Sequence, residues 1–190
     1  LYRFYAKIRN SKILEESFEG MSLEIDGQEV FVQFVGRFNA SNLLAAYGAL
    51  CQLGVDSQEA LIQLSAATPV NGRFEAIRSK EGVTAIVDYA HTPDAVLKII
   101  KEVSKIKHNR IITIIGCGGN RDKTKRPIMG KIACKYSNYV IFTNDNPRSE
   151  NEKDIMNDIL KGASGKYEVI YDRYEAIRKG ISLLKEDMIL

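Results

Sequence analysis

The chain has 190 residues, enough for one large domain or two small ones, and its 45% apolar and 27% charged residues are typical of a soluble globular protein. The formal net charge of +3 is small, and basic residues do not gather with aromatic ones, which argues against a nucleic-acid partner. No apolar run comes close to the roughly 20 residues that span a bilayer, and no charged-then-apolar start marks a secretion signal, so we expect no membrane partner.

The three cysteines are Cys51, Cys117 and Cys134. An odd number of widely spaced cysteines without a histidine cluster predicts reduced thiols in a cytoplasmic protein, and argues against a structural zinc site. The sequence starts at Leu1 within strand-like residues, and residues 188–190 have the pattern of a strand that has just begun. Natural termini seldom lie inside a buried strand, so we expect a piece of a longer protein, cut at both ends.

The first 35 residues predict antiparallel strands. Residues 2–9, 21–25 and 30–35 alternate between apolar and polar side chains, and Asp26-Gly27 is a strong signal for a hairpin turn.

The apolar period then changes to that of a helix. A first helix is predicted from Asn39 until Gly54 closes it, and a second one is capped by Asp56 or Ser57 and ends near Ala66.

Residues 71–82 are rich in glycine and charge and predict a connector between two domains, residues 1–76 and residues 77–190. Strands and helices alternate strictly beyond it. The expected strands are 83–87, 111–115, 139–143, 167–170 and one that starts at 188, and the expected helices are 93–106, 127–136, 151–161 and 172–185. This alternation predicts an α/β fold with a doubly wound, mainly parallel sheet.

Two loops in this second domain are the best candidates for a site. A glycine-rich turn, residues 116–121, follows the strand 111–115, and a proline-stiffened turn, residues 145–148, follows the strand 139–143. Parallel strands joined by a helix bring both loops to the carboxyl edge of the sheet, where open α/β sheets bind ligands. We therefore predict that Arg148 reaches the hollow beside the glycine turn, a site for an anionic, amino-acid-like or phosphorylated ligand.

Taken alone, each loop allows a second interpretation. The glycine turn has arginine where G-x-G-x-x-G needs its third glycine, and no GK[ST] follows, so a tight strand-to-helix turn fits as well as an anion site. The cations that follow it are also compatible with solvated surface; they are Arg121, Lys123, Lys125 and Arg126. Arg148 can grip a carboxylate bidentately, but an Asx-Pro turn with an exposed arginine is the more frequent arrangement.

Two further pairs are candidates. Asp88 and His91 follow another strand at the same edge, where they can contact ribose hydroxyls and phosphate; alternatively, Asp88 or Thr92 merely caps the next helix. Asn39 and Asn42 are three residues apart at a helix start and share a face, which also suits capping residues.

Five segments together resemble the Mur ligase family, the ATP-dependent amino-acid ligases of peptidoglycan synthesis. In family order they are GRFNASNLLAA (36–46), NGRFE (71–75), VDYAHTPDA (87–95), GCGGNRDKTKRPIMG (116–130) and DNPRSE (145–150). The resemblance implies that residues 1–76 are the strand-and-helix tail of the central ATP-binding domain, and that residues 77–190 are the Rossmann-like C-terminal domain that binds the amino acid.

The resemblance also implies roles for individual residues. The ATP contacts would be Asn39, Asn42, Arg73, Asp88 and His91. The amino-acid pocket would comprise Arg121, Asp145, Asn146, Pro147 and Arg148. In this family DNPR marks users of meso-diaminopimelate, whose distal carboxylate can pair with Arg148; lysine, added by relatives without this arginine, has no such group.

The implied reaction, with ATP and Mg²⁺, joins meso-diaminopimelate to the D-glutamate γ-carboxylate of UDP-N-acetylmuramoyl-L-alanyl-D-glutamate through an acyl phosphate. Several family features do not occur in this sequence: GK[ST], the carbamylated lysine, the magnesium-binding acids and the GKGHE loop. We therefore expect no catalytic residue and no metal ligand in these 190 residues, and no ligase activity from them alone.

Three rival hypotheses remain open. A folylpolyglutamate- or cyanophycin-type ligase shares the superfamily, although DNPR and DYAHTPDA argue against it. A non-catalytic nucleotide- or amino-acid-binding module is the second rival. A strand followed by GK[ST] upstream of Leu1 would support the ligase, and its absence would support the module. A Rossmann-like redox domain lacks support because G-x-G-x-x-G is missing.

Overall fold

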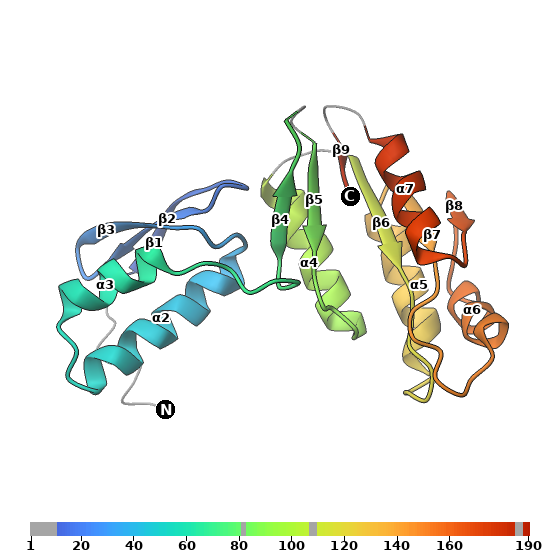
Figure 1. Ribbon diagram of the computed structural model, residues 1–190, viewed down its shortest axis with the longest axis horizontal. Coiled ribbons are helices and arrows are strands. Elements are labelled where there is room, and N and C mark those ends of the chain that lie inside the picture. Colours follow the sequence, from blue (N-terminus) through green and yellow to red (C-terminus); the bar gives the residue numbers. More distant parts are fainter. Residues whose placement is uncertain (1–10, 81–82, 107–109, 185–187) are drawn as a thin grey trace. The chain divides into compact units, whose positions relative to one another are not determined.

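The computed structural model describes residues 11–80, 83–106, 110–184 and 188–190 (Figure 1). Its backbone contacts divide the chain into two compact units, and the boundary between them in the sequence lies between Ala76 and Ile77. The predicted strand at residues 2–9 lies outside the described residues. Among the helices that are described, none is long and apolar enough to cross a bilayer.

Three antiparallel strands form the sheet of the first unit: β1 (Ser11–Glu16), β2 (Met21–Ile25) and β3 (Gln28–Val32). The predicted hairpin turn is confirmed, because Asp26 and Gly27 join β2 to β3 with φ angles of 51° and 78°. The third strand ends at Val32, earlier than predicted. β1 was not predicted, since its charged residues leave it mostly exposed and only pairing with β2 makes it a strand.

Two helices pack beside this sheet, α2 (Arg37–Gln52) and α3 (Ser57–Ala66). Alternate residues of β2 are buried, and they join the buried residues of both helices in one core: Met21, Leu23, Ile25, Leu43, Tyr47, Leu61 and Leu64. Asp56 caps α3 as predicted, because its carboxylate accepts from the backbone N–H groups of Gln58 and Glu59.

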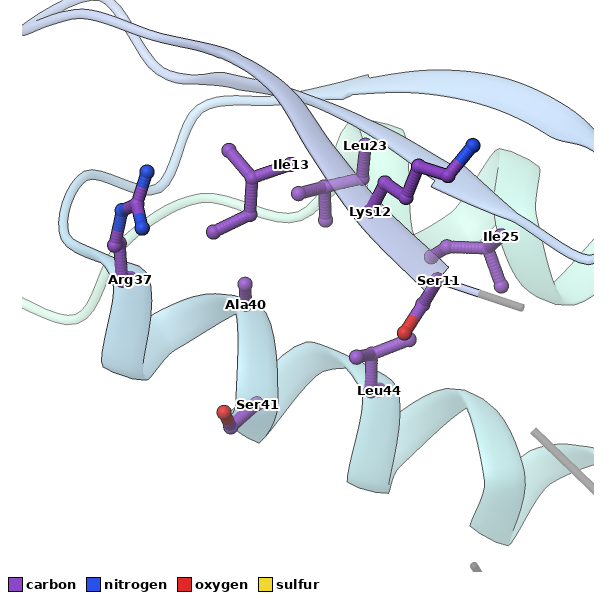
Figure 2. A pocket seen from close by; sticks show the side chains of 9 residues that line it. All are labelled: Ser11, Lys12, Ile13, Leu23, Ile25, Arg37, Ala40, Ser41 and Leu44. Carbon is purple, nitrogen blue, oxygen red and sulfur yellow. The ribbon is translucent and has the colours of Figure 1, made fainter. Parts of the chain in front are cut away.

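A pocket of about 200 Å³ opens between the sheet and α2 of this unit. Figure 2 shows Ile13 and Leu23 of the sheet facing Ala40 and Leu44 of α2, with Arg37 at one end. None of the predicted site residues lines this pocket.

The second sheet has six strands in the order β4-β5-β9-β6-β7-β8. Their bounds are β4 (Glu75–Arg78), β5 (Thr84–Val87), β6 (Arg110–Ile115), β7 (Tyr139–Phe142), β8 (Tyr167–Val169) and β9 (Met188–Ile189). The neighbours from β5 through β9, β6 and β7 to β8 are all parallel, which confirms the predicted mainly parallel sheet. The prediction of a connector at residues 71–82 was wrong in part, because EAIR has a single branched apolar residue and becomes β4 only by pairing at the sheet edge.

Four helices accompany this sheet: α4 (Pro93–Ile106), α5 (Lys125–Tyr136), α6 (Glu152–Leu160) and α7 (Arg173–Leu183). α5 packs between α4 and α6, while α7 packs on β6 and β7. Figure 1 shows α7 on the opposite face of the sheet from α4 and α5. Helices therefore cover both faces, as a doubly wound α/β fold requires.

Glycines allow α5 and α6 to approach closely. A Cβ atom on Gly130 would collide with the backbone carbonyl of Ile159, and one on Gly162 would collide with the carbonyl of Pro127. This contact sets where α6 lies relative to the start of α5, and hence where Asp158 meets Arg126.

We expect Gly130→Ala to destabilise the protein. Alanine usually favours a helix over glycine by about 1 kcal/mol, but forcing atoms into a packed interface costs about 1–3 kcal/mol, and the collision here is with rigid backbone. Denaturant unfolding measures the difference, with the exposed Lys131→Ala as the control in the same helix. A Gly130→Ala protein more stable than its parent would contradict the packing described.

Candidate functional site

The loops that follow β5, β6, β7 and β8 all leave the sheet at its carboxyl edge, because these strands run parallel. The edge thus carries residues 88–92, 116–124, 143–151 and 170–172. Two of these loops contain the glycine turn and the Asp145–Arg148 turn, so the fold places both predicted turns at one edge.

These two turns interlock. A Cβ on Gly116 would collide with the carbonyl of Thr143, and one on Gly119 would collide with the carbonyl of Pro147. At Gly118 it would lie 2.9 Å from Nη1 of Arg148 and 3.8 Å from Oδ2 of Asp145. The glycines are therefore required because the loop after β7 passes directly against the loop after β6, a reason that neither interpretation of the turn had included.

Arg148 contacts the glycine turn, as the strand order predicted. Its Nη1 donates to the carbonyl of Gly119 at 2.7 Å, and the Gly119 N–H donates to the carbonyl of Asn146 at 2.9 Å. The Arg148 residue is exposed, and the part of the chain that the structure describes offers no further partner to its guanidinium. Whether this group binds a substrate stays a prediction.

The backbone holds Arg148 in an uncommon conformation, with φ at 51°. The left-handed region costs a residue other than glycine about 1–2 kcal/mol, so neighbouring contacts must maintain it. The Glu150 N–H donates to the carbonyl of Pro147 at 3.0 Å, which closes a turn around Arg148, and the Arg148 N–H donates to Oδ1 of Asn146 at 3.1 Å.

A buried ion-pair network fixes the end of this turn. Arg126 is fully buried, and its guanidinium donates to both carboxylate oxygens of Glu150 at 2.9 and 3.1 Å and to Asp158 at 3.1 Å. Glu150 also pairs with Lys123 at 3.2 Å and accepts from the backbone N–H of Asn120. The hydrogen bonds from Arg126 are the main reason that the pKa of Glu150 falls to about 2.

Arg126 corrects an interpretation of the cation run as either an anion site or solvated surface. Its side chain is neither, because it is buried against two carboxylates. No pattern in the sequence distinguishes Arg126 from Lys123 and Lys125, because the burial of Arg126 depends on where α6 and the loop after β7 lie. Its Nε atom has no hydrogen-bond partner among the described residues.

Arg121 and Cys117 differ in where their side chains lie. Arg121 is exposed at the end of the glycine turn, and no described residue engages its guanidinium. Cys117 is buried under the turn, with its Sγ 3.8 Å from Sδ of Met129, and burial raises the pKa of the thiol to about 11. Cys117 is thus a protonated packing residue, and all three cysteines are free.

The loop after β5 contacts the start of α5. Lys125 Nζ, at the start of α5, donates to the carbonyl of His91 at 2.7 Å. Thr92 accepts from the N–H of Ala95 in the first turn of α4 at 3.3 Å, which confirms that Asp88 or Thr92 caps this helix, and identifies Thr92 as the cap. Asp88 accepts from the N–H of Ala90 at 2.7 Å.

The other predicted ATP residues lie in the first unit. Asn39 Nδ2 donates to the carbonyl of Val35 at 2.8 Å, and Asn42 Nδ2 donates to Oδ1 of Asn39 at 3.2 Å. Neither caps α2, whose N-cap position is Gly36. Arg73 is brought near them, because the rings of its neighbour Phe74 and of Phe38 pack edge to face, 5.4 Å apart.

No cluster of three or more His, Cys, Asp or Glu side chains is placed to hold a metal ion in the regions that the structure describes.

Comparison with known families gives the chain its place. The family model described as the glutamate ligase domain of Mur ligases matches residues 72–190, more than half of the sequence. This chain belongs to the Mur ligase family. The predicted α/β domain at residues 77–190 lies within the matched region of this Mur ligase chain.

Individual proteins similar to this chain are ligases of the same family. The UDP-N-acetylmuramoyl-L-alanyl-D-glutamate--2,6-diaminopimelate ligase of Phocaeicola vulgatus is 51% identical over 186 residues, which cover 94% of this chain and 38% of that protein. A solved ligase structure of the same name is 33% identical with a TM-score of 0.65, covering 96% of this chain and 38% of its own. This Mur ligase chain thus spans less than two fifths of the length of these relatives.

A more distant structure shares the fold alone. Folylpolyglutamate synthase of Mycobacterium tuberculosis, solved with ADP and AMPPCP, has a TM-score of 0.72 at 17% identity, covering 95% of this chain and 44% of that chain.

The Glu150 network predicts a specific acid sensitivity. Because the folded-state pKa of Glu150 is lowered from 4.5 to about 2, its contribution to stability is complete above pH 4.5 and is lost as the pH falls through that range. The difference in Tm between the parent protein and Glu150→Gln should therefore be constant near neutral pH and shrink as the pH falls from 4.5 towards 2. A difference that persists undiminished down to the lower limit would contradict the ion pairing.

Proposed function

We propose that the full-length protein containing this Mur ligase chain ligates meso-diaminopimelate to the D-glutamate γ-carboxylate of UDP-N-acetylmuramoyl-L-alanyl-D-glutamate, in the cytoplasm. The observation that carries the proposal is Arg148, presented at the carboxyl edge of the sheet with one N–H on the Gly119 carbonyl. The 51% identity to a ligase named for these substrates supports it.

The proposed reaction has two steps. The γ-phosphoryl group of ATP is transferred to the D-glutamate γ-carboxylate, which gives an acyl phosphate and ADP. The amine of diaminopimelate then attacks the acyl carbon, an amide forms, and phosphate leaves while the nitrogen loses a proton. An enzyme accelerates such steps mainly by positioning the reactants and stabilising the developing charge.

The geometry around Arg148 suits the distal end of diaminopimelate. Among the residues that the structure describes, only Nη1 of Arg148 is engaged, so its Nε–Nη2 edge remains for two parallel hydrogen bonds to a carboxylate. Asp145 lies in the same loop; its Oδ1 accepts from the Asn146 N–H at 2.8 Å, and its Oδ2 lies near Gly118. An amine beside the bound carboxylate would find an acceptor in Oδ2. We propose that Arg121, Asn146 and Pro147 complete this pocket.

For ATP, we propose contacts from Asn39, Asn42, Arg73, Asp88 and His91. Asn42 is exposed, and it uses one N–H on Asn39, which leaves its carbonyl oxygen and a second N–H to match the donor and acceptor edge of adenine. The nucleotides in the folylpolyglutamate synthase of the same fold support a nucleotide partner. Mg²⁺ belongs to the proposal as the counterion of the phosphates.

The folylpolyglutamate-type alternative has little to favour it. That synthase has the higher TM-score, but its 17% identity reports the fold only, whereas the diaminopimelate ligase structure is 33% identical. An amino-acid screen on the full-length protein separates the two.

Replacing Arg148 with alanine tests the proposed substrate. In the full-length protein, Arg148→Ala should raise the KM for meso-diaminopimelate strongly and leave the KM for ATP nearly unchanged, because losing a charge-assisted pair costs about 2–5 kcal/mol. Steady-state kinetics measures both, with Arg178→Ala as the control, an arginine on α7 paired with Glu175 on the same helix. An equal rise in both KM values would mean that Arg148 is structural.

Asn42→Ala tests the nucleotide side. The KM for ATP should rise by about an order of magnitude, as for one or two lost hydrogen bonds, while the KM for meso-diaminopimelate stays constant. Ser41→Ala is the control, an exposed neighbour on α2. Unchanged ATP kinetics in Asn42→Ala would remove this residue from the proposed site.

A further inference from the structure

We propose that Arg126 and Glu150 are positioning residues for the amino-acid site: Arg126 holds Glu150, and Glu150 holds the turn at residues 147–150 so that it presents Arg148. This inference rests on the proposed function, because the proposed function supplies the ligand that Arg148 binds.

The first step is the burial of Arg126. A fully buried guanidinium is stable only where carboxylates and carbonyls satisfy it, and here its partners come from separate parts of the chain. Glu150 belongs to the loop after β7, and Asp158 belongs to α6. Arg126 itself lies in the first turn of α5, and its Nη2 also donates to the carbonyl of Gly118 at 3.5 Å, so this single side chain ties the glycine turn to the loop after β7.

The second step is the conformation of Arg148. The turn that contains Arg148 begins at the carbonyl of Pro147 and ends at the N–H of Glu150, 3.0 Å apart. Pro147 is held by its close approach to Gly119, and Glu150 is held by Arg126, Lys123 and the Asn120 N–H. With both ends fixed, Arg148 stays at its positive φ. Once Glu150 is released, Arg148 can relax to the right-handed region, which moves its guanidinium off the Gly119 carbonyl.

Two carboxylates on the same guanidinium provide a matched comparison. Glu150 and Asp158 each accept from Nη1 of Arg126 at 3.1 Å, but only Glu150 lies in the turn that carries Arg148. Glu150→Gln and Asp158→Asn each remove one negative charge that pairs with the same buried cation. If both carboxylates serve stability alone, the two changes should have similar kinetic effects. If Glu150 positions Arg148, only Glu150→Gln should change the KM for the amino acid.

The experiment is steady-state kinetics of the full-length protein with ATP and meso-diaminopimelate, at a temperature at which every variant is folded. Glu150→Gln should raise the KM for meso-diaminopimelate by about tenfold, with the KM for ATP unchanged within about twofold. Asp158→Asn should lower Tm but leave both KM values unchanged. Glu150→Asp, which keeps the charge on a shorter side chain, should fall between Glu150→Gln and the parent protein.

Coupling to Arg148 is the decisive measurement. If Glu150 acts through Arg148, the double variant Arg148→Ala/Glu150→Gln should have the same KM for meso-diaminopimelate as Arg148→Ala alone, because residues that act as one unit are not additive. Multiplied effects in the double variant would overturn the inference, as would equal effects of Glu150→Gln and Asp158→Asn.

The outcomes also separate this inference from the proposed function. A rise in KM with Arg148→Ala but none with Glu150→Gln overturns the positioning role and leaves the function standing. No rise with Arg148→Ala overturns the proposed role of Arg148, and the positioning role with it.

Discussion

The close approach of two loops at the carboxyl edge of the sheet is the constraint on which the candidate site depends. The backbone of residues 143–147 passes so near to residues 116–119 that side chains at Gly116 and Gly119 would collide with carbonyl oxygens. Dense contact of this kind leaves little freedom to either loop, because protein interiors relax only slightly around added atoms. It places the Arg148 guanidinium on the Gly119 carbonyl, and the proposed amino-acid pocket starts from that contact.

Charge reinforces what close packing begins. Arg126 is taken out of water completely, which is costly for a cation unless its partners are well placed. Glu150 and Asp158 supply them, and exposed lysines neutralise the outer side of the same carboxylates. We infer that this network serves mainly to specify a conformation. Here the conformation it specifies is a turn with an arginine in the left-handed region, a local strain of the kind found where a side chain must be aimed.

Family membership and local geometry point in the same direction but answer different questions. The family match and the 51% identity place the chain among Mur ligases and beside a diaminopimelate ligase, although it spans 38% of that protein's length. The geometry supports the proposed substrate, an amino acid with a second carboxylate, because among the described residues the guanidinium is anchored by one N–H and its other edge is open. The fold alone would not distinguish this substrate, since a folylpolyglutamate synthase shares it.

The sequence by itself determined the features that depend on local pattern. Alternating strands and helices predicted the parallel α/β sheet, Asp26-Gly27 predicted the hairpin turn between β2 and β3 of the antiparallel sheet, and the parallel order alone brought the glycine turn and Arg148 to one edge. The tertiary structure decided what depends on distant partners: the short strand β4 exists through pairing, and Arg126 is buried because α6 and Glu150 converge on it. The physical reason is that hydrogen-bond pairing and charge burial are set by neighbours in space, which a run of similar basic residues does not reveal.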